Sequence, residues 1–137
     1  MYSFETKIRI RYGDTDKMGY AYYGNYPRFY EVGRTEMLRS LGYTYGRLED
    51  QGIMMPVISL NINYFQPAYY DDELTIKTIV KELPLVKMRF EYEIRNTKGD
   101  LINQGETVLA FIDEITRKPM RAPKQIMERL EPFFIKE

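Results

Sequence analysis

The sequence predicts an α+β fold in which a curved antiparallel sheet wraps around one long central helix, with residues 1–137 forming a single domain. Three observations predict it. One broad apolar helical pattern spans positions 26 to 41. Four consecutive segments of alternating polar and apolar residues follow it, separated by short turns. A sheet with one apolar face needs a cover, and this helix is the long apolar element available for it.

The N-terminal part of the chain predicts a strand, a loop and a helix start. Segment Phe4–Arg11 alternates apolar and polar residues with period two, which is typical of a half-buried strand. Residues Gly13–Gly24 are predicted to form a loop. Asn25 is the predicted N-cap of the helix, and Pro27 is compatible with its first turn.

The long helix is predicted over Tyr26–Leu41 and ends at Gly42, a C-terminal glycine. Its apolar residues recur on one face: Tyr26, Phe29, Tyr30, Gly33, Met37 and Leu41. A glycine inside a helix costs about 1 kcal/mol relative to alanine. We therefore expect the sheet to approach the helix closely at Gly33. A short helix is expected to follow within residues 44–50.

The second half of the chain predicts strands joined by tight turns. The predicted strands are Val57–Phe65, Leu74–Val80, Lys87–Arg95 and Leu101–Ile112. Lys98-Gly99-Asp100 is a hairpin signal, and Gly105 is a possible bulge. Because short turns impose antiparallel pairing of neighbours, we predict a meander. A short helix is predicted over Lys124–Leu130.

Composition excludes several classes of partner and location. Twenty basic and 20 acidic residues cancel, so no charge excess favours nucleic acid or an acidic membrane. The absence of cysteine excludes disulfides and is compatible with a reducing cytoplasm, which is the location we expect. The N-terminus has no apolar signal region, and no apolar run approaches the ~20 residues of a membrane span.

The chain has neither histidine nor cysteine. A Ser-His-Asp or Cys-His arrangement is therefore impossible, and so is a zinc site built on these ligands. The phosphate-loop and dinucleotide-binding glycine motifs do not occur. Chemistry must come from carboxylates, hydroxyls, amides, basic groups and backbone dipoles. We expect no metal and no cofactor.

Two carboxylates, Asp14 and Asp16, precede the helix start at Tyr23-Gly24-Asn25. An ionised carboxylate can attack an activated acyl carbon or take a proton from water. The free N–H groups and positive dipole end of a helix can hold the oxyanion that forms. Gly24 would let a substrate approach the backbone. On the residues alone, the same Asp-x-Asp turn is typical of a structural turn in which Asp14 forms an Asx-turn.

Several motifs together resemble the 4-hydroxybenzoyl-CoA thioesterase family over nearly the whole chain. They are Asp14-Thr15-Asp16-Lys17-Met18-Gly19, Tyr22-Tyr23-Gly24-Asn25-Tyr26, Phe29-Tyr30-Glu31-x-x-Arg34, Tyr64-x-x-Pro67-Ala68, Asp71-Asp72-x-Leu74 and Arg89-x-x-Tyr92-x-Ile94. The resemblance implies a hot-dog fold, a sheet wrapped around one long helix. It also implies metal-independent hydrolysis of acyl-CoA thioesters, with coenzyme A as part of the substrate.

The resemblance also implies roles for individual residues. Asp16 matches the catalytic aspartate, and the backbone N–H of Tyr23 matches the oxyanion donor. Tyr12 matches a tyrosine near the catalytic aspartate of some relatives. Many relatives carry histidine at the position of Tyr23, and this chain departs from them. Whether Asp16 acts as nucleophile or as general base therefore stays open.

The remaining expectations concern the substrate and the assembly. Predicted substrate-binding residues are Gly24, Asn25, Ser59, Asn61, Lys87 and Arg89, the last two as contacts of coenzyme A phosphates. The family resemblance implies homodimers that pair into homotetramers, with sites at the dimer interface. Two alternatives remain: a thioesterase acting on acyl carrier protein, and a non-catalytic acyl-CoA-binding protein. A hydratase of similar fold is disfavoured because those enzymes use a catalytic histidine.

Overall fold

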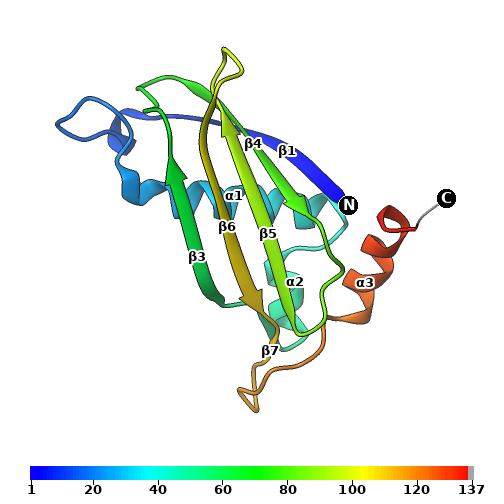
Figure 1. Cartoon of the computed structure of the whole chain (residues 1–137). Coiled ribbons are helices and arrows are strands. Elements are labelled where there is room, and N and C mark those ends of the chain that lie inside the picture. Colours follow the sequence, from blue (N-terminus) through cyan, green and yellow to red (C-terminus); the bar gives the residue numbers. More distant parts are fainter. Residues whose placement is uncertain (136–137) are drawn as a thin grey trace.

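A computed structural model describes residues 1–135, and its main feature is a five-stranded antiparallel sheet with helix α1 (Tyr26–Ser40) along one face (Figure 1). The order across the sheet is β1-β4-β5-β6-β3. In chain order the strands are β1 (Tyr2–Arg9), β3 (Val57–Tyr64), β4 (Glu73–Val80), β5 (Lys87–Arg95) and β6 (Leu101–Ala110). This arrangement confirms the predicted fold class.

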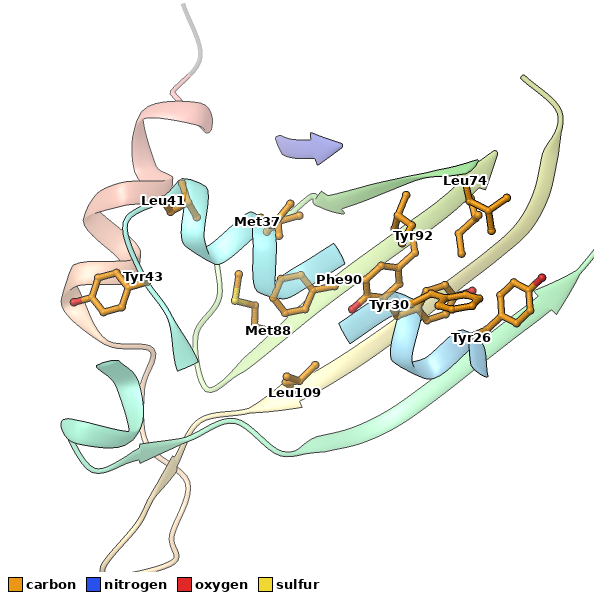
Figure 2. Packing of buried hydrophobic residues seen from close by; sticks show 14 of the residues in the cluster. Tyr26, Tyr30, Met37, Leu41, Tyr43, Leu74, Met88, Phe90, Tyr92 and Leu109 are labelled. Carbon is orange, nitrogen blue, oxygen red and sulfur yellow. The ribbon is translucent and has the colours of Figure 1, made fainter. Parts of the chain in front are cut away.

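The apolar face predicted for α1 is the face that the sheet buries. Its predicted members Phe29, Tyr30 and Met37 are at most 1% exposed and pack against apolar side chains of β4, β5 and β6 (Figure 2). Gly42 follows the helix with φ +85°, as a C-terminal glycine does. Asn25 occupies the N-cap position, but its side chain does not cap the helix.

Gly33 lies where α1 crosses β4. A Cβ atom added there would lie 2.5 Å from the Thr78 Oγ1 and 3.0 Å from the Ile76 Cγ2. The predicted close approach of sheet and helix is therefore confirmed. The absence of a side chain at this position allows α1 to pack directly on β4.

The predicted meander is correct for β4, β5 and β6 and wrong for β3. β3 pairs with β6 and lies at the sheet edge opposite β1. The segment after β3 does not form a hairpin because it docks on the loop after β1. There the Ala21 N–H donates to the carbonyl of Ala68 at 2.8 Å, and the Asp71 N–H donates to that of Ile10 at 2.8 Å. These contacts carry the chain across to start β4 between β1 and β5.

Gly105 is not a bulge, contrary to the prediction. It stands in regular register between Tyr92 of β5 and Ile62 of β3. A side chain there would collide with the hydroxyl of Tyr30, which explains the glycine. The register shifts of the sheet lie elsewhere, at positions 57–59 of β3 and 94–95 of β5.

Other boundaries differ by a few residues. β1 starts and ends two residues before the predicted limits, and the last long strand ends at Ala110. The predicted loop contains 3-10 turns at its two ends, Tyr12–Asp14 and Tyr23–Asn25. β3 is exposed on both faces over most of its length, although its pattern is that of a half-buried strand. β3 is the last strand at this edge of the sheet.

Smaller elements complete the described chain. They are α2 (Tyr45–Asp50), β2 (Ile53–Met54), β7 (Ile112–Asp113) and α3 (Lys124–Leu130). β2 and β7 form a separate two-stranded sheet. α3 has the predicted limits, and the turn after it accepts a hydrogen bond from the N-terminus (Figure 1). Within residues 1–135, each helix is too short or too polar to cross a membrane.

Two tyrosines of the core keep their hydroxyls hydrogen-bonded, as the tyrosine-rich composition requires. The rings of Tyr30 and Tyr92 stack with centroids 4.2 Å apart (Figure 2). The Tyr30 hydroxyl donates to the Asn103 Oδ1, and that of Tyr92 lies 2.5 Å from the Thr107 Oγ1. Burial raises the pKa of Tyr92 to about 12 and raises that of Tyr30 as well.

Candidate active site at the start of helix α1

A small hairpin holds Asp16 just before α1. The 3-10 turn Tyr12–Asp14 leads into a β-bridge between Thr15 and Ala21. The Asp16 N–H donates to the carbonyl of Tyr20 at 3.2 Å, and the Asp16 carbonyl accepts from the N–H of Gly19 at 3.0 Å. Gly19 has φ +87°, a left-handed conformation that favours glycine. The turn therefore has a defined geometry.

Asp14 is a structural residue of this loop. Its Oδ2 accepts the N–H of Arg11 at 2.9 Å, and its Oδ1 forms an ion pair with Arg28 of α1. The Asp14 carbonyl accepts two further bonds, from the Tyr22 N–H and the Asn25 Nδ2, both at 2.8 Å. Two of these contacts close the loop on itself, and the two from Asn25 and Arg28 tie it to the helix start. They agree with the turn-forming role predicted for Asp14.

The carboxylate of Asp16 has fewer partners. Its Oδ1 accepts the Met18 N–H at 2.9 Å, and no cation within residues 1–135 forms an ion pair with it. It is half-buried and lines a cavity of about 690 Å³ together with Tyr12, whose ring meets that of Tyr70 edge-on at 5.9 Å. An anionic carboxylate without a fixed counter-charge beside a cavity can attack an electrophile or accept a proton.

Some backbone N–H groups at the helix start donate hydrogen bonds within the chain, and others do not. Four of them are donated within the chain, at residues 21, 22, 25 and 26. The N–H groups of Tyr23 and Gly24 have no acceptor among residues 1–135. They lie at the positive end of the α1 dipole, where a developing negative charge is stabilised. The start of α1 can therefore supply an oxyanion site.

The two predicted substrate contacts at the helix start, Asn25 and Gly24, are both in contact with other residues of the chain. The Asn25 side chain is bonded to the Asp14 carbonyl. The space where a Gly24 Cβ would lie is filled by the ring of Tyr22. Hydrogen bonding with the Tyr23 phenol is the main cause that raises the pKa of Tyr22, and the charge of Asp16 adds a smaller effect. The Tyr22 ring therefore packs beside Gly24 and against the ring of Tyr23, with centroids 4.8 Å apart.

A largely apolar pocket of about 380 Å³ adjoins the helix start. It is lined by Met18, Tyr20, Ala21, Tyr23, Tyr26, Tyr64, Phe65, Gln66 and Pro67. The Tyr64 ring meets those of Tyr23 and Tyr26 edge-on, with centroids 6.3 Å and 5.2 Å apart. Burial, and secondarily Tyr64, raises the pKa of Tyr26 to about 12. A pocket of this size and polarity can enclose an acyl group.

The most informative residue that sequence reasoning missed is Tyr64. Its hydroxyl donates to the carbonyl of Tyr23 at 2.8 Å, across 41 positions of sequence. The only signal for it in the sequence was its place in the Tyr64-x-x-Pro67-Ala68 motif, which gives no function. Strand pairing cannot be foreseen from this motif, so the contact with the helix start could not be predicted.

The other four predicted binding residues lie on the opposite face of the sheet. Ser59 and Asn61 pair with Val108 and Glu106 of β6, and these positions alternate with those that face α1. Lys87 and Arg89 lie on the same outer face, since Met88 and Phe90 point into the core.

Within one chain, these outer-face residues therefore do not line the cavity beside Asp16 or the apolar pocket. Arg89 is paired with Glu106, whereas Lys87 forms no ion pair within residues 1–135. Both basic residues border a smaller pocket of about 130 Å³.

Known proteins are similar to this chain in architecture and in sequence. A family model described as the thioesterase-like superfamily matches residues 10–130. The chain is 34% identical over 125 residues to the acyl-CoA thioesterase YbgC of Haemophilus influenzae, covering 90% of each chain. It is 32% identical over 124 residues to the acyl-CoA thioester hydrolase YbgC of Escherichia coli O6:H1, covering 90% and 92%. A solved DHNA-CoA thioesterase from Staphylococcus aureus has TM-score 0.85 and 39% identity, covering 98% of this chain and 87% of that one.

The sheet wrapped around α1 is a hot-dog fold, and the solved structures that share it include thioesterases. The chain belongs to the thioesterase-like superfamily. The resemblance to the 4-hydroxybenzoyl-CoA thioesterase family that the motifs carry is thereby confirmed.

Proposed function

We propose that this protein hydrolyses acyl-CoA thioesters, with Asp16 as its catalytic carboxylate and with no metal or cofactor. The observation that carries the proposal is the pair of unused N–H groups at Tyr23 and Gly24, which follow an Asp16 carboxylate that has no cation partner within residues 1–135. The likeness to acyl-CoA thioester hydrolases over 90% of the chain supports the substrate class.

Thioester hydrolysis moves the negative charge of Asp16 to the thioester carbonyl oxygen, where it must be stabilised. In the general-base route, Asp16 takes a proton from water, and the hydroxide adds to the thioester carbon. The carbonyl oxygen becomes an oxyanion held by the N–H of Tyr23, and the intermediate then expels the thiolate of coenzyme A. The thiolate takes up the proton from Asp16, which leaves the carboxylic acid product and free thiol.

In the nucleophilic route, an Asp16 oxygen attacks the thioester carbon and expels the thiolate, forming a mixed anhydride that water then opens. A single turnover in water enriched in heavy oxygen detects the nucleophilic route when water opens the anhydride at its aspartyl carbon. That attack leaves the label in the Asp16 side chain, which the general-base route never does. Label found in the product alone is expected both of the general base and of an anhydride opened at its acyl carbon.

We also propose a homodimer, with two dimers forming a homotetramer. Edge strand β3 presents several exposed apolar residues, namely Val57, Ile58, Leu60 and Tyr64. An uncovered apolar strand edge is a surface that a second copy can continue. Lys87 is then the proposed contact of the coenzyme A phosphates, with Arg89 beside it, and Ser59 and Asn61 would meet substrate only in the assembly.

Thiol release from a panel of acyl-CoA thioesters tests the function. We expect the wild type to turn over at least one thioester, and Asp16→Asn and Asp16→Ala to lose at least ~100-fold in kcat, the scale of general acid–base catalysis. Asp50→Asn, at the exposed end of α2, is the matched control and should keep wild-type kcat. Full activity of both Asp16 variants would reject the assignment of Asp16.

The same assay decides between the remaining alternatives. Thiol release from acyl carrier protein thioesters that exceeds release from acyl-CoA would favour the carrier-protein thioesterase. Calorimetric binding of acyl-CoA without any thiol release, across all chain lengths, would favour a non-catalytic binding protein instead.

A further inference from the structure

Tyr64 links the edge of the sheet to the helix start. It is the last residue of β3, and its hydroxyl donates to the carbonyl of Tyr23 at 2.8 Å. Its ring is in edge-on contact with the rings of Tyr23 and Tyr26. Tyr64 thus touches the residue that carries one of the two unused N–H groups, and it does so through that residue's backbone.

The Tyr23 carbonyl belongs to the same planar peptide unit as the N–H of Gly24. It accepts two hydrogen bonds, from the Tyr64 hydroxyl and from the N–H of Tyr26. Two donors on one carbonyl fix the plane of that peptide and polarise it, which makes its N–H a stronger donor. The direction in which the Gly24 N–H points is therefore set from the sheet.

Tyr64 adds an anchor from the sheet to a helix start that the loop also holds, through the contacts of Asn25 and Arg28 with Asp14. Upstream of Tyr23, the chain is held by the N–H bonds of Ala21 and Tyr22 to residues 68 and 14. Downstream, Gly24 has the widest conformational freedom of any residue, and helix ends fray. Hydrogen-bond donors assist an oxyanion when they are already oriented before the reaction.

We infer that Tyr64 is a positioning residue for the oxyanion site, acting on the reaction through the peptide between Tyr23 and Gly24. This inference rests on the proposed thioester hydrolysis. Tyr64 does not act as acid or base. It holds the N–H of Gly24, one of the two unused backbone donors, in the orientation that the transition state requires.

Tyr64→Phe removes the hydroxyl and keeps the ring that packs on Tyr23 and Tyr26. Tyr2→Phe is the matched control, because the Tyr2 hydroxyl also bonds to α1, at Ser40 near its far end, at 2.5 Å. We expect Tyr64→Phe to lower kcat by about 10-fold, less than the loss of a direct oxyanion donor, with KM within about twofold of wild type. Tyr2→Phe should leave both constants unchanged.

A second measurement is independent of activity. NMR relaxation of the Gly24 amide should show greater mobility in Tyr64→Phe than in the wild type, and no change in Tyr2→Phe. The inference is overturned if Tyr64→Phe keeps wild-type kcat in an active enzyme, or if the Gly24 amide is unaffected. It is also overturned if kcat falls only together with the melting temperature, which would indicate a merely structural contact. If the wild type cleaves no thioester, the proposed function and this role are both rejected.

Discussion

Asp14 and Asp16 differ in what their carboxylate oxygens contact. Those of Asp14 hold the Arg11 N–H and the Arg28 side chain, whereas Asp16 holds only the Met18 N–H. The sequence placed both in one turn, and the distinction between them follows from these partners. Their roles can be separated by stability measurements.

Asp14→Ala should lower the free energy of unfolding by about 1–2 kcal/mol, because it removes the acceptor for a backbone N–H and the partner of Arg28. Asp16→Asn should change it by less than about 0.5 kcal/mol, since an amide oxygen can still accept the Met18 N–H. Urea unfolding measures both. An equal loss in the two variants would contradict the separation of roles.

Gly33→Ala should destabilise the protein although alanine is the better helix former. The added methyl group would meet Thr78 and Ile76 of β4 at 3.0 Å or less, and overpacking of this kind costs about 1–3 kcal/mol. Gly46→Ala in α2 is the control, because its nearest contact would be 3.8 Å away. Thermal unfolding should show a lower Tm for Gly33→Ala alone. A Tm for Gly33→Ala at or above wild type would show that the helix can move away from the sheet.

Tyr92 makes stability depend on alkaline pH. Burial raises its pKa to about 12 against an opposing effect of Arg34, whereas an unfolded tyrosine titrates near pH 10. Above about pH 10 the unfolded state binds fewer protons than the folded state, so stability that is present below pH 10 is lost as the pH rises towards 12. The contribution of Tyr92 to this loss should approach ~3 kcal/mol, measured as the difference between wild type and Tyr92→Phe in urea unfolding. Tyr92→Phe should show a smaller loss over this interval, and an identical pH profile would contradict the assignment.

Among the helices and strands, sequence patterns predicted the features that depend on neighbouring residues in the chain. The limits of α3 and most of α1 were predicted because periodicity, prolines and glycines encode them. The position of β3 beside β6 was not predicted, because it depends on the docking of residues 65–72 against the loop after β1. The role of Gly105 was not predicted either, because it depends on a contact with Tyr30 of α1, which is distant in sequence.

The exposed edge of strand β3 is the proposed contact between subunits. Ile58 is 50% exposed at this edge, and a lysine there would place a charge in the proposed subunit contact. Ile58→Lys should break the contact through β3 and lower the mass of the proposed oligomer in sedimentation velocity. Ser3→Lys adds the same charge at the other sheet edge, on β1, and should leave the mass unchanged. A wild-type mass for Ile58→Lys would argue against assembly through β3.

In the whole molecule, the candidate site is assembled from three segments, of which one is distant in sequence from the other two. The loop after β1 brings Asp16, the start of α1 brings Tyr23 and Gly24, and the end of β3 brings Tyr64. The first two are adjacent in sequence, so the carboxylate and the helix start could be predicted together. The third comes from the sheet topology, and no local pattern indicated it.

The outer face of the sheet carries the two basic residues proposed to contact coenzyme A. Lys87 and Arg89 lie there, away from α1, so their proposed contact with coenzyme A depends on how copies of the chain assemble. In the proposed oligomer, these outer-face residues would meet a substrate bound beside Asp16 of another copy. If Lys87 contacts coenzyme A in the oligomer, its removal should raise KM and leave kcat unchanged.

In the proposed reaction, a thioester lies between Asp16 and the N–H groups of Tyr23 and Gly24. A crystal structure of Asp16→Asn with an intact acyl-CoA, one that the wild type cleaves, would test this placement. We expect the thioester oxygen at hydrogen-bond distance, about 3 Å, from the Tyr23 N, with the residue 16 side chain beside the thioester carbon. A thioester bound away from the start of α1, with both N–H groups left unused, would contradict it.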